Sequence, residues 1–162
     1  MANAIVYYGI MSRSSAMTTS AKPAKKPIKG SLIESIFGKK VSELQQAVIV
    51  EKGLPTDSIN VLRDEGLTFS EVHGIILPAR TLKHRRQKKQ PLSMEETDRT
   101  IRICKAITLA DKVFGNRDKA LGWLRRANPR LEGRAPLELL KSEVGGELVR
   151  QMLFQIDEGI FV

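Results

Sequence analysis

The densest chemical feature of this sequence is a run of basic residues at positions 80–89. Those ten positions hold six Lys or Arg and one His. Lys and Arg carry the positive charge that attracts phosphate oxygens, and Arg also donates paired hydrogen bonds to base edges. The run therefore favours nucleic-acid binding, with a solvated basic helix or a localisation signal as the plainer alternatives.

The charge is spread unevenly along the 162 residues. The chain has 27 Lys and Arg against 18 Asp and Glu, a formal net charge of +9. Residues 1–90 hold 15 of the basic and 7 of the acidic residues (+8), which leaves 12 against 11 (+1) for residues 91–162. Such asymmetry indicates one half that faces nucleic acid and another half with a different role.

The composition favours helices over a β sandwich. The chain is 41% hydrophobic but only 5% aromatic, and it is rich in Leu, Ile, Lys, Arg and Glu. A chain of this length can bury a real core, either as one ordinary domain or as two small ones. We therefore expect an all-α fold.

The residues before and within the basic run predict a helix-turn-helix. Residues 68–76 suit a short helix with a polar cap, which Pro78 breaks. Its buried side chains are expected to be Phe69, Val72 and Ile75 or Ile76. A basic helix follows, in which Leu82 alone points inward, and in this layout the second helix lies in the major groove. The side chains that would reach bases or phosphates are Arg80, Thr81, Lys83, His84, Arg85 and Arg86.

The N-terminal part combines a basic tail with further short helices. Residues 12–30 are mostly Ser, Thr, Ala, Lys and Pro, so residues 1–30 are predicted to be a disordered basic tail. Apolar residues then recur at three- and four-residue spacings within 31–53, which is typical of helices. The helix-turn-helix domain is expected to span residues 31–92.

A second helical domain is predicted for residues 93–162. Ser93 and Glu96 form a capping-box pattern that opens a long helix to about residue 114, and Asn116 caps the next one. Pro136 fits the first turn of a short helix. A last helix is expected at about 143–158. The residues that this helix is expected to bury are Val144, Leu148, Val149, Met152, Leu153 and Ile156.

Two features of this last segment need an explanation. The pair Gly145-Gly146 indicates close packing against another helix rather than an anion site, because Glu143 and Glu147 would repel a phosphate. The chain ends in three large apolar residues, 160–162, and such a tail needs a surface that covers it. Its own domain and a partner protein are both open possibilities.

The sequence contains no recognisable set of Cys, His or carboxylate residues at the spacing of a metal site or a catalytic pair. The single cysteine excludes an internal disulfide framework and suits a reducing cytoplasm. Cys104 shares a helix side with Ile101 and Ile107, which predicts a buried residue rather than a reactive thiol. His73 and His84 lack further ligands at metal spacing. With no membrane-spanning apolar run and no nucleophile–base pair, we expect a cytoplasmic protein that is not an enzyme and uses no metal or cofactor.

From residue 53 to residue 162, about two thirds of the chain, the sequence resembles the antitoxins of the Xre/MbcA/ParS group, which pair with RES-domain toxins. The residues that carry the resemblance are ARTLKHRR at 79–86, PLSMEETDRTIRI at 91–103, VFGNRDKALGWL at 113–124, NPRLEGRAPLELL at 128–140 and IDEGIFV at 156–162. The pattern NP-x-L-x-G-R-x-P-L-x-L-L is the most specific of these.

The resemblance implies an Xre-like helix-turn-helix followed by a helical toxin-binding domain. Members of the group bind a toxin encoded beside them, and toxins of the RES type consume NAD. The antitoxin would block the toxin's active site through its C-terminal segment, and the complex, containing an antitoxin homodimer, would bind and repress its own promoter. The residues assigned to toxin binding on this basis are Leu148, Met152, Ile156, Gly159, Ile160, Phe161 and Val162.

The sequence is compared with two other classes of function, a freestanding transcription regulator and an enzyme. A freestanding helix-turn-helix transcription regulator would use the C-terminal domain and its apolar tail for dimerisation. An enzyme would need a catalytic constellation that the sequence does not contain. A RES-like product of the neighbouring gene would favour the antitoxin.

Overall fold

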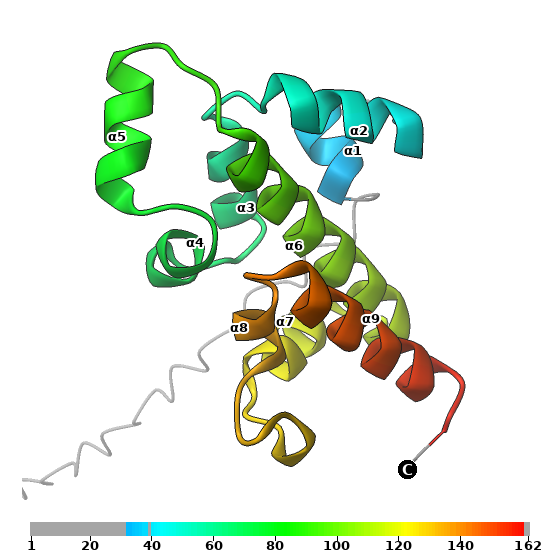
Figure 1. Ribbon diagram of the computed structural model, residues 1–162. Coiled ribbons are helices and arrows are strands. Elements are labelled where there is room, and N and C mark those ends of the chain that lie inside the picture. Colours follow the sequence, from blue (N-terminus) through cyan, green and yellow to red (C-terminus); the bar gives the residue numbers. More distant parts are fainter. Residues whose placement is uncertain (1–31, 39, 161–162) are drawn as a thin grey trace, which may run out of the picture.

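The computed structural model describes residues 32–38 and 40–160, and every regular element in these ranges is a helix (Figure 1). The predicted basic tail at 1–30 lies outside the described residues. The elements are α1 (Leu32–Phe37), α2 (Glu43–Lys52), α3 (Ser58–Asp64), α4 (Phe69–Ile75), α5 (Ala79–Gln87), α6 (Met94–Phe114), α7 (Arg117–Arg125), the 3-10 turn η1 (Pro129–Leu131), α8 (Pro136–Leu139) and α9 (Glu143–Asp157). The predicted all-α class is confirmed.

The long helix α6 runs through the middle of the molecule and supports most of the others. In Figure 1, α1 and α2 lie above α6, whereas α7, α8 and α9 lie below it. Helices α1, α2, α7 and α9 all pack against α6. Its inward residues Ile103, Cys104 and Ile107 have no exposed surface, so α6 belongs to a core shared by both halves of the chain.

Side-chain caps define where several helices begin. Ser42, Thr68 and Ser93 each accept a hydrogen bond from a backbone N–H three residues on, and the residue at that position bonds back to complete a capping box. Asn116 caps α7 in the same way, through the N–H of Lys119. Such a cap typically contributes about 1 kcal/mol. The helix starts predicted at 68, 93 and 116 are confirmed.

Three residues that were expected to be buried are exposed. Phe69, Val144 and Leu148 all lie at the surface, and Val144 is 82% exposed. The inward side of α4 consists of Val72, followed by Ile75 and Ile76, and Phe69 in the first turn lies outside it. The burial predicted for these three residues was wrong because a periodic pattern locates an apolar stripe but not its edges.

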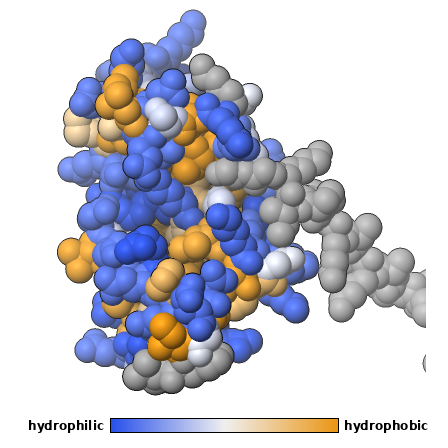
Figure 2. Space-filling view, turned by 90° about the vertical axis from the view of Figure 1, so that its right-hand side faces the viewer, coloured by the Kyte–Doolittle hydropathy of each residue, from blue (hydrophilic) through white to orange (hydrophobic). Residues whose placement is uncertain are grey.

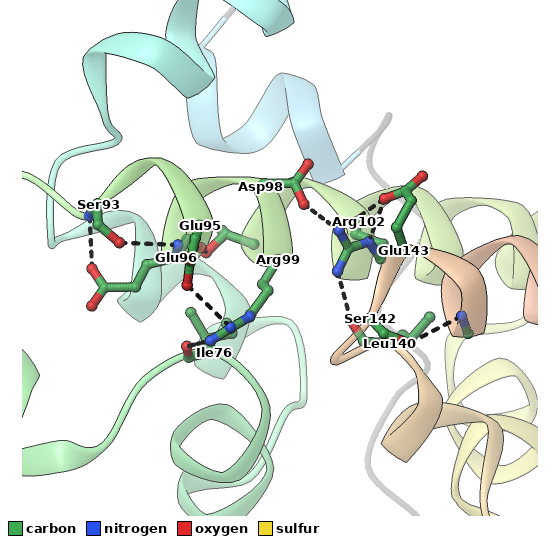
Figure 3. Close-up of polar contacts among 12 residues, drawn as sticks. Ile76, Ser93, Glu95, Glu96, Asp98, Arg99, Arg102, Leu140, Ser142 and Glu143 are labelled. Carbon is green, nitrogen blue, oxygen red and sulfur yellow. Dashed lines mark hydrogen bonds and ion pairs between the residues drawn. The ribbon is translucent and has the colours of Figure 1, made fainter.

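The two glycines of α9 allow this helix to approach its neighbours closely. A Cβ added at Gly145 would lie 2.1 Å from the carbonyl oxygen of Leu139, and one at Gly146 would lie 2.6 Å from Cδ of Arg102. Arg102 lies at this crossing between Asp98 and Glu143, and its guanidinium also donates to the carbonyl of Leu140 (Figure 3). The predicted close helix packing is confirmed.

Arginines of α6 and α7 also form hydrogen bonds and ion pairs with residues 65–76, which precede the basic helix α5. Arg99 donates to the carbonyl of Ile76, in the turn before α5 (Figure 3). Arg117 binds the partly exposed Glu65 as well as the buried Asp111 of α6. Arg125 binds Glu71 and the carbonyl of Gly66. The turn and the first residues of α4 are therefore held from the other half of the chain.

Candidate nucleic-acid interface and protein-binding surface

The basic helix α5 lies at the edge of the molecule (Figure 1). Pro78 occupies its N-cap in an extended conformation (φ −59°, ψ 146°) and provides no side-chain cap. Leu82 is its one buried side chain, as predicted. With only Leu82 buried, most other side chains of α5 reach the surface.

The first half of α5 presents its charged groups to solvent. Arg80, Lys83 and His84 are exposed, and Thr81 is half-buried beside Leu82. Among the residues that the structure describes, no carboxylate pairs with Arg80 or Lys83. These two cations are therefore available for phosphate oxygens, and the assignment of all four residues to DNA binding stays a prediction.

The next two arginines bind the protein itself. The guanidinium of Arg85 lies 2.8 Å from Glu96 and donates to the carbonyl of Pro91 at 3.3 Å. The guanidinium of Arg86 donates to Asn60 at 2.9 Å and lies 4.0 Å from Asp57. Both side chains hold α5 against its neighbours, so any contact that they make with DNA competes with these partners.

A hollow of about 340 Å³ lies between α3, α4 and α5. The residues around it include Ile59, Arg63, Phe69, Leu82 and Lys83. Arg63 lies over the ring of Phe69, 5.8 Å from its centroid, which is a cation–π contact at an exposed ring. The hollow adds a cationic rim beside the basic helix.

The second candidate surface is the outer side of α9. Val149, Met152 and Leu153 face inward and are buried, whereas Val144 and Leu148 face solvent. With Glu143, Glu147 and Gln151 they line a shallow groove of about 500 Å³. Val144 stands five residues before Val149, about 140° away around a helix. A helical wheel would therefore have shown that these two valines face different ways.

The C-terminal residues predicted to bind a partner are distributed between core and surface. Met152 is 5% exposed and Ile156 is partly buried, whereas Leu148, Gly159 and Ile160 are exposed. Gly159 adopts a left-handed backbone (φ 67°) directly after α9, a conformation that glycine tolerates best. Phe161 and Val162 lie outside the described residues.

Two acidic residues in the first half of α9 pair with arginines. Glu147 accepts two hydrogen bonds from Arg150 and one from Gln151, and these bonds lower the pKa of its carboxyl to about 2. Glu143 pairs with Arg102 at 2.8 Å. The face of α9 thus offers apolar contact between paired charges.

Cys104 and His73, the other residues that could take part in catalysis or bind a metal, have structural roles instead. Cys104 is completely buried, and burial raises the pKa of its thiol to about 12, so it is not a reactive thiolate at neutral pH. The Nδ1 atom of His73 lies 2.9 Å from the carbonyl oxygen of Leu77. Within the described ranges, no group of three His, Cys, Asp or Glu side chains is placed to hold a metal ion, and no helix is long and apolar enough to cross a membrane.

Two family models match adjoining stretches of the chain. Residues 45–104 match the antitoxin Xre-like helix-turn-helix domain, and residues 109–159 match the antitoxin Xre/MbcA/ParS C-terminal toxin-binding domain. The first stretch contains α5, and the second contains α9. Together they cover more than half of the chain.

Two curated proteins are similar to the chain. A protein named Antitoxin Xre from Pseudomonas putida is 40% identical over 98 residues, which cover 60% of this chain and 62% of that protein. Another Antitoxin Xre, from Yersinia enterocolitica, is 29% identical over 86 residues, which cover 52% of this chain and 58% of that protein. The matches therefore span about three fifths of the length of these relatives.

The fold and the two surfaces define an all-helical protein with a helix-turn-helix domain and a C-terminal protein-binding domain. The chain belongs to the Xre-type antitoxin family, as the resemblance at residues 53–162 implied. The two family descriptions name a helix-turn-helix domain and a toxin-binding domain, which agrees with the expectation that the chain is not an enzyme. The helix-turn-helix match extends to residue 104, into α6, and the predicted domain division at 92/93 stays a prediction.

Proposed function

We propose that this chain binds a cognate RES-domain toxin and sterically blocks the toxin's active site, so that the toxin cannot consume NAD. The observation that carries this proposal is the outer side of α9. This helix lies in the stretch matched by a toxin-binding domain, and it leaves Val144 and Leu148 exposed in a groove. Large apolar side chains that share an exposed groove are typical of a surface that another protein covers.

The segment that we propose to enter and block the toxin's active site is the end of α9 with the residues that follow it. Ile160 is 49% exposed, and Gly159 before it turns the chain away from the helix axis. We propose that Leu148, Ile160 and the residues after Ile160 contact the toxin, with Met152 and Ile156 supporting the helix from its inner side. The face on the right of Figure 1, which includes the end of α9, carries hydrophobic patches between hydrophilic side chains (Figure 2).

The second part of the proposal concerns DNA. The toxin–antitoxin complex would bind its own promoter through α5 and thereby limit its own synthesis. The matched helix-turn-helix domain and the exposed cations Arg80 and Lys83 support this role. We propose residues 31–92 as the DNA-binding region and residues 93–162 as the toxin-binding region, with a homodimer of the chain in the complex.

The deciding measurement is cellular NAD after induction of the RES-type toxin, with and without this chain. We expect NAD to fall when the toxin is alone and to be preserved when the chain is present. A chain with Val144→Glu and Leu148→Glu should fail to preserve NAD, because two carboxylates would be buried in the complex. Met94→Glu, at an exposed apolar residue in the first turn of α6, is the matched control and should preserve NAD.

Two outcomes would contradict the proposal. If NAD does not fall when the toxin is alone, the partner does not consume NAD. If NAD is preserved equally by the double variant, the groove at Val144 and Leu148 is not the blocking surface. In that second case, deletion of residues 159–162 tests the tail separately, and a loss of self-association on deletion would favour the freestanding regulator.

A further inference from the structure

The basic run continues past the end of α5 into a pair of lysines, Lys88 and Lys89. Both side chains are exposed, and neither forms an ion pair with another described residue. Lys89 has a left-handed backbone, with φ 51°. Among the described residues, the other positions with a positive φ hold glycine, except for Glu132. Lys89 is therefore a charged side chain at a position that suits glycine.

The end of α5 requires this backbone conformation. The N–H of Gln90 donates to the carbonyl of Arg85 at 2.9 Å. The N–H of Lys89 donates to the carbonyl of Arg86 at 3.2 Å. These bonds form a Schellman motif, in which the residue after the C-cap is left-handed and is usually glycine. A side chain at that position brings its Cβ close to the following carbonyl oxygen, so lysine is less favourable than glycine for the fold at position 89.

The loop that carries Lys89 is held in place on both sides. Arg85, in the last turn of α5, donates to the carbonyl of Pro91 at 3.3 Å. The N–H of Leu92 donates to the carbonyl of Leu54 at 2.8 Å. Because these bonds fix the turn, the loop cannot relieve the strain by changing its conformation. An unfavourable backbone whose side chain has no ion-pair partner among the described residues points to a contact with a ligand.

We propose that Lys89 binds a phosphate of the promoter DNA, and that this contact offsets its unfavourable backbone. This step rests on the proposed function, in which α5 binds the promoter. Lys89 follows Arg80 at a distance of roughly 13 Å along a helix axis. The major groove is about 12 Å wide, so cations at the two ends of α5 can reach phosphates on its two sides. In Figure 1, α5 and the loop after it lie at the outer edge of the molecule.

The alternative is that Lys89 serves only the fold, through the dipole of α5. A cation near the C-terminus of a helix is favourable, and this effect falls off within the last turn. The last turn of α5 already contains Arg85 and Arg86, and Lys88 is its C-cap. A further charge at position 89 therefore adds little to the dipole interaction, whereas glycine there would remove the strain. A role in the fold alone does not require lysine at this position.

The test is Lys89→Gly in the full chain, alone and in complex with the toxin. The probe is a fluorescently labelled duplex of the region upstream of the gene, and anisotropy is measured at several salt concentrations. We expect the affinity to fall roughly 5- to 10-fold at about 0.1 M salt and the log–log salt slope to decrease by about 0.9. The unfolding temperature of the chain should rise by roughly 2–4 °C, because the strain is removed.

Three further variants separate the charge from the strain. Lys89→Ala should lose the same affinity without the gain in unfolding temperature, because alanine keeps the Cβ. Lys89→Arg should keep the affinity of the parent chain. Glu132→Gly is the matched control, since Glu132 is exposed, has φ 56° and lies 3.8 Å from Arg134 in a pair that is largely exposed. It should raise the unfolding temperature by a similar amount and leave the affinity and the salt slope unchanged.

Two results with the parent chain bound to DNA would overturn this inference alone. One is a Lys89→Gly variant that binds the duplex with the affinity and salt slope of the parent chain. The other is a Lys89→Gly variant that is no more stable than the parent chain, since the strain would then be absent. If the parent chain does not bind the duplex in either form, even at low salt, the DNA-binding part of the proposed function fails together with this inference.

Discussion

The basic run contains residues of two kinds, and the structure distinguishes them by their partners. Arg85 and Arg86 bind Glu96 and Asn60 and thereby hold α5 in place. Arg80 and Lys83 are exposed and have no such partner among the described residues. Sequence alone makes these four cations equivalent, because the contacts that separate them join residues 11 and 26 positions apart.

This difference predicts how DNA binding depends on salt. Each phosphate contact steepens the log–log dependence of affinity on salt by about 0.9. The double substitution Arg80→Ala and Lys83→Ala should therefore weaken promoter binding and reduce the slope by about 2, as measured by fluorescence anisotropy at several salt concentrations. Lys119→Ala, at an exposed lysine of α7, is the control and should change neither quantity.

The unfolding temperature of each variant distinguishes lost DNA contacts from a destabilised fold. The double variant should unfold at the same temperature as the parent chain, since neither side chain has an ion-pair partner among the described residues. Arg85→Ala should lower that temperature, because it leaves the carboxylate of Glu96, 10% exposed, without its guanidinium. An unchanged salt slope for the double variant would show that α5 does not contact phosphates through these residues.

At the scale of the helix, the crossing of α9 over α8 and α6 depends on two glycines with different neighbours. The Cβ of an alanine at 145 would overlap a backbone carbonyl, whereas one at 146 would overlap the flexible side chain of Arg102. Alanine favours a helix over glycine by about 1 kcal/mol at both positions. The two substitutions are therefore matched in propensity and differ in packing.

We predict that Gly145→Ala lowers the free energy of unfolding by about 1–3 kcal/mol, because overpacking outweighs the propensity gain. Gly146→Ala should lower it by less than Gly145→Ala does, since a side chain shifts more readily than a backbone carbonyl. Arg102 must nevertheless shift against its bonds to Glu143 and Leu140. Urea unfolding of the full chain measures both. Equal effects at the two positions would contradict the close approach of α9 to Leu139.

The starts of the helices could be predicted from sequence, whereas the exposure of the side chains on them could not. Ser93, Thr68 and Asn116 act through atoms three residues away, so local patterns were enough to find them. The exposure of Leu148 depends on which elements cover α9, and α9 packs on α6, much earlier in the chain, as well as on the adjacent α8. The sequence pattern therefore located the candidate C-terminal site but not which of its residues face outward.

At the scale of the whole molecule, arginines join the helix-turn-helix part to the C-terminal part. Arg117 and Arg125 of α7 reach Glu65 and Glu71, 52 and 54 residues earlier in the chain. No periodicity or motif indicates pairs at such distances, because they exist only once α7 lies beside α3 and α4. The relative position of the two surfaces therefore could not be predicted from sequence.

The Glu71–Arg125 pair makes this junction sensitive to acid. Burial acts to raise the pKa of Glu71, but hydrogen bonds from Arg125 and Thr68 outweigh it, and the pKa is lowered from its usual 4.5. A carboxyl with a lowered folded-state pKa binds its proton less readily when folded than when unfolded. Its stabilising effect is therefore complete above about pH 4.5 and is lost as the pH falls through the lower folded-state pKa.

We predict that Glu71→Gln destabilises the chain by roughly 0.5–1 kcal/mol at neutral pH, allowing for solvent screening of a partly exposed pair. This difference from the parent chain should shrink as the pH falls from about 6 to about 3. Glu138→Gln, at an exposed residue of α8, is the control and should show no such trend. Chemical unfolding at a series of pH values measures the difference. A constant difference would mean that α4 is held to α7 by packing, so that the orientation of α4 and α5 would not depend on this ion pair.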